Sequence, residues 1–570
     1  MKAPLSFAQK KTKKLPSQHL SRYSDIARKL LIHRGIYTDK EAEKVLKGDY
    51  VEGLHDPFLM KSMDKAVGRI TSALKKDEHV AIFSDYDADG VPGGVLLRSF
   101  LDRVGFKNVT SYIPHRGIEG FGLNKEAVEA LSKKGVTLII TVDCGITDTE
   151  EVLLAEELGI DVIITDHHLP PDPLPEAYAI LDPKQADCTY PFKELCGAGV
   201  AYKLVQALMA HSDIEFPEGQ EKWLLDLVGI ATLADMVPLI DENRIFARYG
   251  LLVLRKGRRP GLKELFVQAR VDYRFVNEED ITFTVAPRIN AASRMAHPDI
   301  AFALLFSSSR GEALRRALEL EEINKERKTL VASIVREVKK KIAKRTLGSV
   351  IVVGDPHWRP GILGLIASAL VDTFGKTVFV WGREGDGDLK GSVRSDGVMN
   401  VVELMRALPE DSFLGFGGHE RSAGFSVEID KVDILEDLLN THAHTTSSDE
   451  SDAETIKTYD AAILADELEG KLFEDVLALA PFGVGFEKPL FKIEKARVVS
   501  LKEFGKGKNH LEVVIEGKGG VLFKSIGFFM TRTHFEREIA LGENITLYGS
   551  LEKSYYTRNP EYRIRIEHIE

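Results

Sequence analysis

Three aspartates stand at alternate positions directly after an apolar run, in the stretch IFSDYDADGVPGGV of residues 82–95. Without cations, the carboxylates of Asp85, Asp87 and Asp89 would repel one another, and at least one would have to take up a proton. A helix cap needs only one such side chain, and an EF-hand loop would need a glutamate where Leu96 stands. The spacing therefore indicates a divalent-cation site of another kind.

Further candidate ligands lie in three separate segments of the chain. Asp143 stands in TVDCGI, Asp166, His167 and His168 form part of TDHH, and Asp235 stands in LVGIATLADMVPL. The last segment is strongly apolar, so an unpaired carboxylate there would be costly. Mixed oxygen and nitrogen ligands suit Mn²⁺ or Mg²⁺ better than a structural zinc. Taken singly, each aspartate could equally be a cap or an ion-pair partner, but the four segments together predict a site for two divalent cations.

The surrounding sequence predicts the elements that bring these side chains together. From about residue 50 to 240, short β-branched runs such as EHVAIFSD, VTLIITVD and DVIITDHH alternate with helical stretches. This alternation is typical of a parallel sheet covered on both faces. Ligands of such sheets bind beyond the carboxyl ends of the strands. The side chains expected there are Asp87, Asp89, Asp143, Asp166, His167 and His168.

Changes of pattern divide the rest of the chain, which is too long for one hydrophobic core. Residues 310–345 lack proline and predict one long helix, and a polar stretch before the last hundred residues indicates a linker. Short strands between glycine and polar turns then predict a β-barrel. The expected parts are an N-terminal segment (1–50), a parallel-sheet domain (51–309), a connecting helix (310–345), a second α/β domain (346–440), a linker (441–456) and the barrel (457–570).

Composition narrows the class of protein. Of the 570 residues, 44% are hydrophobic and 29% are charged, as in ordinary soluble globular proteins. The three cysteines show no CxxC spacing, which fits a reducing cytoplasm and predicts neither disulfides nor a thiolate zinc site. The first residues lack a secretory pattern, and we expect no membrane span. The net charge of −11 weakly opposes nucleic-acid binding, but a local basic groove and bound cations can offset it.

Eleven motifs together resemble one family. They are SDYDADG, YIPHRGIEGFGLN, TVDCGI, TDHH, LCGAGVAYKL, ATLADMVPL, PRINAASRM, HWRPGILGLIASAL, GSVRS, GFGGHERSAG and APFGVGFEKPLF. On these residues the chain resembles the DHH phosphoesterase superfamily and, within it, the RecJ group of single-strand-specific 5′→3′ DNA exonucleases. The resemblance implies an α/β DHH domain and an α/β DHH-associated domain joined by a long helix, followed by an oligonucleotide-binding (OB) barrel. It also implies release of 5′-mononucleotides from single-stranded DNA in DNA repair and recombination.

The resemblance assigns the candidate ligands to two cations. The implied set is Asp87 on one Mn²⁺ or Mg²⁺ ion, Asp89, His167 and Asp235 on the other, and Asp143 as the bridge between them. Asp85 becomes a supporting carboxylate. Some superfamily members have a histidine where this chain has Phe83, so one ion would have fewer protein ligands. His168, Asp85 or water would then complete its shell.

A third set of residues is expected to bind the strand. By resemblance, Arg116, Ser392 and Arg394 form a 5′-phosphate pocket, for which forked guanidinium donors are suited. The other implied phosphate or substrate contacts are His168, Arg288, Asn290, Gly417, Gly418 and His419. In the barrel, basic and stacking groups suited to single strands are Lys502, Lys506, Lys508, Lys553, Tyr555, Tyr556 and Arg558.

Other functions remain open at this point. One is a DHH phosphodiesterase for short oligonucleotides or cyclic dinucleotides, although such enzymes generally lack the added barrel. Another is a non-catalytic replication scaffold of the same fold, although every implied metal ligand is present. A haloacid-dehalogenase-type phosphatase would use Asp85 as a nucleophile but does not explain TDHH. For the exonuclease, the expected partners are single-stranded DNA, a single-strand-binding protein and a RecQ-type helicase, and we expect a monomer.

Overall fold

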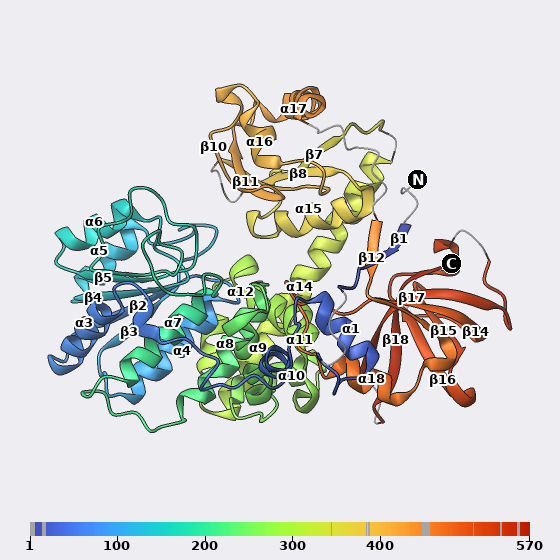
Figure 1. Ribbon diagram of the computed structural model, residues 1–570. Coiled ribbons are helices and arrows are strands. Elements are labelled where there is room, and N and C mark those ends of the chain that lie inside the picture. The colour runs from blue at the N-terminus through green and yellow to red at the C-terminus, as the bar shows by residue number, and fades with distance from the viewer. Residues whose placement is uncertain are drawn as a thin grey trace.

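The computed structural model describes residues 6–13, 19–343, 345–383, 385, 388–446, 456–505, 507–535, 538–555 and 559–570. Its elements form three bodies (Figure 1): a first α/β domain with a large helical part, a smaller second α/β domain, and a C-terminal barrel. Within these residues, no helix combines the length and apolar character needed to cross a membrane.

Five parallel strands form the sheet of the first domain, in the spatial order β3-β2-β4-β5-β6. They are β2 (Val80–Ser84), β3 (Val109–Tyr112), β4 (Leu138–Val142), β5 (Asp161–Thr165) and β6 (Ala179–Leu181). Alternate residues enter two cores: Val80 and Ile82 pack in one, and Ala81 and Phe83 pack in the other. The first core includes α3 (Met63–Lys75), α4 (Gly90–Arg103) and α7 (Gly197–Met209), and the second includes α5 (Lys125–Lys133) and α6 (Thr149–Glu157). The predicted parallel sheet is confirmed.

The alternation of strands and helices ends earlier than the sequence pattern predicted. The last strand ends at Leu181, and the rest of the domain is helical rather than alternating as far as residue 240. Its helices are α8 (Leu225–Ala234), α9 (Asp241–Leu254), α10 (Pro260–Ala269), α11 (Glu278–Asp280), the π-helical turn η4 (Ile281–Val285), α12 (Ala286–Met295) and α13 (Asp299–Phe306). Helices α8 and α9 cross closely at Gly229 and Gly250. A Cβ atom on Gly229 would lie only 2.7 Å from the Cα atom of Gly250, so the crossing requires glycine there.

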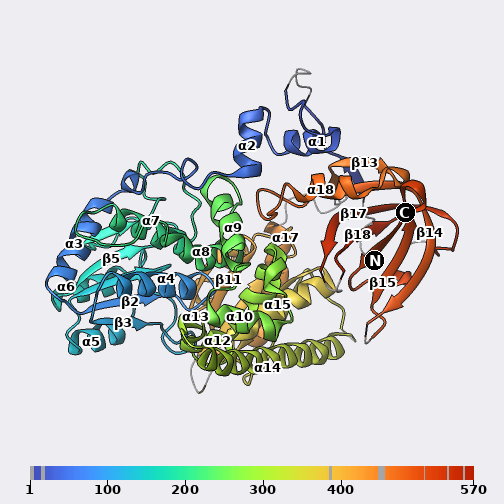
Figure 2. The same cartoon turned by 90° about the horizontal axis from the view of Figure 1, so that it is seen from below.

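A long helix leads to the second domain. Helix α14 (Arg310–Ile342) has 33 residues and therefore spans about 50 Å; Figure 2 shows it running along the lower edge of the molecule. The second sheet has the order β10-β11-β9-β8-β7, in which only the β7–β8 pair is parallel. The strands are β7 (Val350–Gly354), β8 (Thr377–Gly382), β9 (Leu389–Arg394), β10 (Gly415–His419) and β11 (Ser422–Val427), with helices α15 (Pro360–Phe374), α16 (Val401–Arg406) and α17 (Val432–Thr446).

The predicted linker begins later than expected. Helix α17 continues to Thr446, so the first six residues of the stretch 441–456 are helical. The polar composition of residues 441–446 suggested a linker, but a surface helix needs apolar residues on one face only. On that face Leu435, Leu439 and Ala443, spaced four residues apart, are buried in the core of the second domain. Residues 447–455 lie outside the described part of the chain.

The C-terminal strands close into a barrel. Strand β14 pairs with β15 on one side and with β17 on the other, and the circuit runs β14-β15-β16-β18-β17-β14. The elements are β13 (Ala461–Leu464), α18 (Gly470–Leu477), β14 (Phe491–Phe504), β15 (His510–Glu516), β16 (Leu522–Gly527), β17 (Asn544–Ser554) and β18 (Glu561–Ile569). Along β15 every second residue is buried, and in β18 the buried residues are Ile564, Ile566 and Ile569. This closed five-strand circuit confirms the predicted OB-type barrel.

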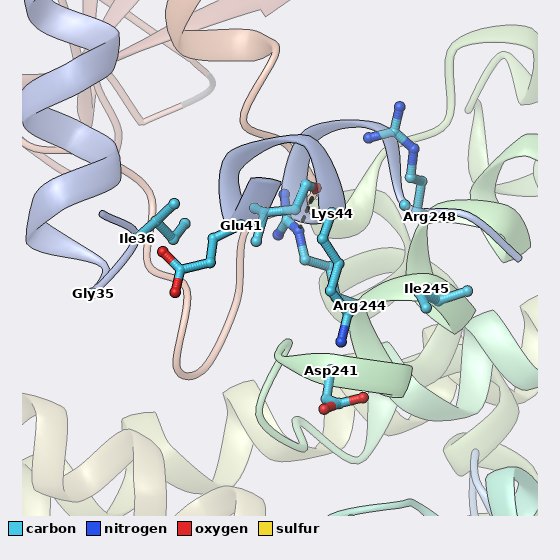
Figure 3. A pocket seen from close by; sticks show the side chains of 10 residues that line it. Gly35, Ile36, Glu41, Lys44, Asp241, Arg244, Ile245 and Arg248 are labelled. Atoms are coloured by element: carbon cyan, nitrogen blue, oxygen red, sulfur yellow. Dashed lines mark hydrogen bonds between the residues drawn. The ribbon is translucent and has the colours of Figure 1, made fainter. Parts of the chain in front are cut away.

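The N-terminal segment joins the barrel to the first domain. Strand β1 (Ser6–Gln9) pairs in parallel with β12 (Ile456–Tyr459), and helices α1 (Asp25–His33) and α2 (Asp39–Lys47) follow. At the junction, a cavity of about 230 Å³ lies between α2 and α9, and Figure 3 shows the side chains that line it. Arg244, 4% exposed, donates Nε to the Val45 carbonyl, Nη1 to that of Pro481 and Nη2 to that of Leu479. One guanidinium thus ties together three parts of the chain.

We expect Arg244→Met to destabilise this junction. The substitution would leave the buried carbonyls of Leu479 and Pro481 and the partly buried carbonyl of Val45 without this donor, and the expected loss is about 3 kcal/mol of unfolding free energy. Denaturant unfolding checks the value. Arg248→Met is the control, because Arg248 is half-buried and donates to the Leu46 carbonyl alone. Equal losses in both variants would contradict the role given to Arg244.

Candidate metal centre and phosphate pocket

Carboxylates and imidazoles from distant segments converge at one edge of the first sheet. The Nε2 atom of His167 lies 3.1 Å from Oδ1 of Asp143, 3.8 Å from Oδ2 of Asp235 and 3.9 Å from Oδ2 of Asp89. Three groups of side chains have ligand atoms within 4.8 Å of one another: Asp85, Asp87 and Asp143; Asp89, His167 and Asp235; and Asp143, His167 and His168. Asp143 belongs to a group with Asp87 and to one with His167, which is the arrangement of a bridging ligand.

The sheet itself sets this convergence. Beyond the last paired strand residues, the backbone of Asp85 donates to the Val142 carbonyl, that of Asp143 to Thr165 and that of Asp166 to Leu181. The carboxyl ends of β2, β4, β5 and β6 are therefore locked side by side. Asp143 adopts a φ of 64°, a conformation that is uncommon for a residue other than glycine.

The start of α7 fits closely against this edge. A Cβ atom on Gly197 would lie 2.4 Å from the Cβ of Asp143, so only glycine allows the approach. The backbone N–H groups of Gly197 and Ala198 donate to the two carboxylate oxygens of Asp89 at 2.6 and 2.8 Å. These bonds fix the carboxylate of Asp89 toward His167 before any ion binds.

The electrostatics of the cluster suit cations. Burial, and then the charge of Asp87, raises the pKa of Asp85 well above its ordinary value and that of Asp89 to about 7. Burial, and then the charge of Asp89, raises the pKa of Asp143 well above its ordinary value and that of Asp235 to about 8. Burial lowers the pKa of His167 to about 3, which keeps the imidazole neutral as a ligand must be. Oδ1 of Asp85 and Oδ1 of Asp143 are buried without a hydrogen-bond donor. The donor set therefore fits two hard divalent ions.

We expect Mn²⁺ to stabilise the fold, and to do so more strongly at about pH 9 than at about pH 6, because protons compete with the ion for the carboxylates whose pKa values are raised. Asp89 and Asp235, with pKa values about 7 and about 8, must lose their protons to become ligands. Thermal unfolding with Mn²⁺ and with a chelator at each pH measures the effect. A shift of equal size at both pH values would contradict it.

The structure places two further residues of this region. Asp235 follows the last residue of α8 as its C-cap, and its side chain is 29% exposed, so the buried apolar stretch is the helix that precedes it. Phe83 is fully buried and stacks on Tyr112 with ring centroids 5.1 Å apart. It is a core residue and offers no ligand atom.

His168 is held as a donor beside the cluster. Its Nδ1 lies 2.7 Å from Oδ1 of Asp166, a carboxylate that also accepts from the backbone of Ile146, His167 and His168. Burial alone would lower the pKa of His168, but the hydrogen bond and the charge of Asp166 raise it to about 9. With Nδ1 occupied, Nε2 is the nitrogen left to reach a phosphate oxygen, in keeping with the predicted role.

A cluster of arginines lies next to the acidic cluster. Arg394 donates to Oγ of Ser392 at 3.1 Å and, in β9, faces the first turn of α15, since a Cβ atom on Gly364 would meet its Nη2 at 2.9 Å. Arg116 lies over the ring of Tyr86 at 4.9 Å. Neither arginine pairs with a carboxylate among the described residues. Burial and the nearby charge of Arg116 lower the pKa of Arg394.

Arg294 is a member of this cluster that the sequence analysis missed. It donates to the Gly361 carbonyl at the start of α15, and a Cβ atom on Gly361 would lie 2.5 Å from the Arg294 carbonyl oxygen. Burial, then the charges of Arg116 and Arg327, lower its pKa to about 9, while Asp87 opposes the shift. Like charges gathered at a helix N-terminus indicate an anion site.

The structure gives Arg288 a different contact from the one expected. Its guanidinium is buried and donates to both carboxylate oxygens of Glu321 on α14, at 2.6 and 3.3 Å. Asn290 and Arg294 are four residues apart and share a face of α12, and Oδ1 of Asn290 is buried without a partner. From the sequence, the 3.6-residue period of a helix could have predicted that Arg288 lies on a different face of α12 from these two residues. The substrate role of Arg288 stays a prediction.

The predicted phosphate contacts of the second domain belong to none of the ligand groups that the described residues form. Gly417, Gly418 and His419 form the exposed edge strand β10, where Gly418 has a φ of 148° and packs against Ala423. No contact of His419 with the metal ligands is present in the described part of the chain. The β-hairpin geometry accounts for Gly418, whereas a Cβ atom on Gly417 would meet open space. The phosphate role of both glycines stays a prediction.

The barrel residues are placed differently from one another. Lys502 is exposed on β14 and Lys508 is exposed in the turn before β15. Tyr555 stacks on Phe275 of the first domain, with ring centroids 4.4 Å apart and planes at 8°, and Lys553 lies 5.8 Å from the Tyr555 ring. Lys506, Tyr556 and Arg558 lie outside the described residues.

Comparison with known families matches all three bodies. The family model described as "DHH family, N-terminal domain" matches residues 79–232, that of the DHHA1 domain matches 347–444, and that of the RecJ OB domain matches 459–568.

Individual relatives are similar over most of the chain. The chain is 37% identical to the single-stranded-DNA-specific exonuclease RecJ of Bacillus subtilis over 94% of this chain and 67% of that protein. It is 31% identical to the exonuclease of the same name from Haemophilus influenzae over 94% of both chains. The crystal structure of Thermus thermophilus RecJ in complex with Mn²⁺ superposes with a TM-score of 0.80 and 25% identity, over 99% of this chain and 79% of that one.

Proposed function

Because the chain belongs to the RecJ family of single-stranded-DNA-specific exonucleases, we propose that it is a metal-dependent exonuclease that degrades single-stranded DNA from the 5′ end and releases 5′-mononucleotides. The observation that carries the proposal is the pair of clusters at one site. Carboxylates and His167 gather where two cations would bind, and Arg116, Arg294 and Arg394 gather beside them with no carboxylate partner among the described residues.

In this proposal, the acidic cluster with His167 and His168 acts at the scissile phosphate, and the arginine cluster binds the strand end. When bound, two divalent cations supply the positive charge that activates water and balances the charge of the phosphoryl oxygens. Asp143 holds its carboxylate between the two ligand groups, and Asp89 is oriented by the N-terminus of α7. His168, charged and held by Asp166, is placed to donate to a phosphate oxygen.

Direction of cleavage follows from the second cluster in this proposal. A 5′-phosphate bound by Arg116, Ser392 and Arg394 would place the next phosphodiester at the metal centre, so mononucleotides would leave from the 5′ end. The charges of Arg116, Asp87 and Arg394 all influence the pKa of Arg294, which supports this layout. A binding pocket for the terminal phosphate also excludes an internal start.

The wider role is proposed on the family alone. We infer that the enzyme works in DNA repair and recombination in the cytoplasm, as a monomer, and that a single-strand-binding protein and a RecQ-type helicase deliver its substrate. The presence of the barrel favours long strands over the alternative substrates, which are short oligonucleotides and cyclic dinucleotides.

Degradation of end-labelled single strands with Mn²⁺ tests the proposal. Strands of one sequence carry the label at the 5′ end or at the 3′ end, and duplex DNA of the same sequence serves as the control. The expected result is immediate release of labelled mononucleotide from the 5′-labelled strand only. Early release from the 3′ label would contradict the direction, and equal degradation of duplex DNA would contradict the strand specificity.

A further inference from the structure

Asn243, near the start of α9, joins two backbone segments that adjoin metal ligands. The residue is fully buried. Its Nδ2 donates to the Glu194 carbonyl at 2.5 Å and to the Pro238 carbonyl at 3.1 Å. Because two carbonyl oxygens accept from this nitrogen, the orientation of the amide is determined. One side chain thus ties the segment before α7 to the loop before α9.

The segment before α7 supports two ligands of one group, which consists of Asp89, His167 and Asp235. At its end, the backbone N–H of Gly197 donates to the carboxylate of Asp89. The backbone of Leu195 lies close enough to His167 to oppose the lowering of its pKa by burial, although Nδ1 makes no full hydrogen bond. A displacement of this segment would therefore move the supports of both ligands.

The loop before α9 continues directly from the third ligand, Asp235. Met236 at its start has a φ of 58°, and Asp241 after its end has a φ of 45°. Residues other than glycine rarely adopt such values, and they persist where the surrounding structure imposes them. The bond from Asn243 to the Pro238 carbonyl lies between these two residues in the sequence. It holds the loop in the conformation that places Asp235.

A buried ion pair fixes the helix that carries Asn243. The side chains of Lys203 in α7 and Glu242 in α9 are 0% exposed, and Nζ lies 3.0 Å from Oε1. Nζ of Lys203 also donates to the His55 carbonyl, and the Tyr190 hydroxyl donates to Oε2 of Glu242 at 2.5 Å. Displacing one partner would leave an uncompensated buried charge. Helices α7 and α9 are therefore locked together beside Asn243.

We propose that Asn243 is a positioning residue of the metal centre. Its amide keeps the supports of Asp89 and His167 and the loop of Asp235 in the arrangement that binds one of the two cations. The inference rests on the proposed function, in which the centre holds two ions. The other ligand group is held instead by the strand ends of the first sheet, and its members are Asp85, Asp87 and Asp143.

Metal affinity should record the loss of the amide. Without it, the two segments are free to move apart, and the ion must order them as it binds, which lowers affinity. Groups that orient metal ligands typically contribute about 10- to 100-fold in affinity. A higher Mn²⁺ concentration should compensate by mass action, so the maximal rate should recover.

Calorimetric titration with Mn²⁺ in the absence of DNA tests the inference. Asn243→Leu keeps the volume and removes both donors. It is expected to weaken binding of one ion by about tenfold and to leave the affinity for the other unchanged. The Mn²⁺ concentration for half the maximal rate on single strands should rise by the same factor.

Asn440→Leu is the matched control. Nδ2 of Asn440 also donates to two backbone carbonyls, those of Val350 and Glu436 at 2.9 Å each, but in the second domain. This variant should bind Mn²⁺ like the parent, even if both asparagine variants unfold at a lower temperature.

Pro238→Gly gives a second variant, which frees the loop of Asp235 without altering the buried amide. It should weaken the same ion by about two- to fivefold. Combined with Asn243→Leu, the loss should be smaller than the product of the separate losses, because both substitutions act on one loop.

Three results would overturn the inference: unchanged Mn²⁺ affinity in Asn243→Leu, an equal loss in Asn440→Leu, or equal weakening of both ions. The proposed function fails in a different way. A parent protein that binds two Mn²⁺ ions, one of them weakened by Asn243→Leu, but degrades no single strand would count against the proposed function alone.

Discussion

Asp143→Ala should abolish Mn²⁺-dependent degradation of single-stranded DNA while the fold remains intact. Asp143 is the carboxylate that occurs in ligand groups with Asp87 and with His167, so its loss removes the shared ligand of both ions. The expected fall in kcat is at least about 1,000-fold, the scale of losing a principal electrostatic group in an active site. Because the carboxylate is buried beside like charges that raise its pKa, its removal should not destabilise the apoprotein.

Two measurements decide this prediction. Calorimetric titration with Mn²⁺ should show that the variant has lost tight binding, and circular dichroism should show an unchanged fold. Asp148→Asn is the matched control: Asp148 is a buried carboxylate close by, but it accepts from the backbone of Leu123 and from Thr147 and belongs to none of the ligand groups. An Asp143→Ala enzyme that kept a tenth or more of the parent rate would contradict the metal assignment.

Arg394→Met should remove the preference for a 5′-phosphorylated strand. The side chain lies at the N-terminus of α15, in contact with Ser392 and near Arg116, and no carboxylate among the described residues balances its charge. A charge-assisted hydrogen bond to a phosphate contributes roughly 2–3 kcal/mol. We therefore expect KM for a 5′-phosphorylated strand to rise about 50-fold, since each 1.4 kcal/mol is a factor of ten.

The strand itself supplies the control for Arg394. KM for a strand with a 5′-hydroxyl should change little, because that strand has no terminal phosphate for the pocket to hold. Arg345→Met serves as the protein control, since Arg345 pairs with Glu436 away from the pocket. If Arg394→Met slowed degradation of the 5′-phosphorylated strand and of the 5′-hydroxyl strand to the same extent, Arg394 would have a structural role. That result would contradict the assignment of Arg394 to a 5′-phosphate pocket.

The acidic cluster could be predicted from the sequence because each of its strand-end residues directly follows a recognisable β-strand. Strand ends of a parallel sheet lie at one edge, so Asp85, Asp143 and His167 had to be neighbours once the strands were recognised. For Asp235, the apolar stretch marked the buried helix α8, and the aspartate that follows this helix is only partly buried.

Contacts between distant segments could not be predicted in the same way. The pairing of β1 with β12 joins residues about 450 positions apart, and nothing in SFAQ or IKTY specifies the partner. The choice between Arg288 and Arg294 depended on which face of α12 meets α14, and only the structure shows Glu321 opposite Arg288. Packing between elements, which periodicity does not encode, decided both cases.

The contact between Gly361 and the backbone of Arg294 holds two helices at a fixed separation. It sets the separation of α12, which carries Arg294, from α15, whose start faces Arg394 of the proposed 5′-phosphate pocket. If the proposed pocket binds the strand end, the length of the excised unit would depend on two helices that touch at a glycine. A single methyl group inserted at that point would widen the spacing and alter how far the strand advances in each cycle.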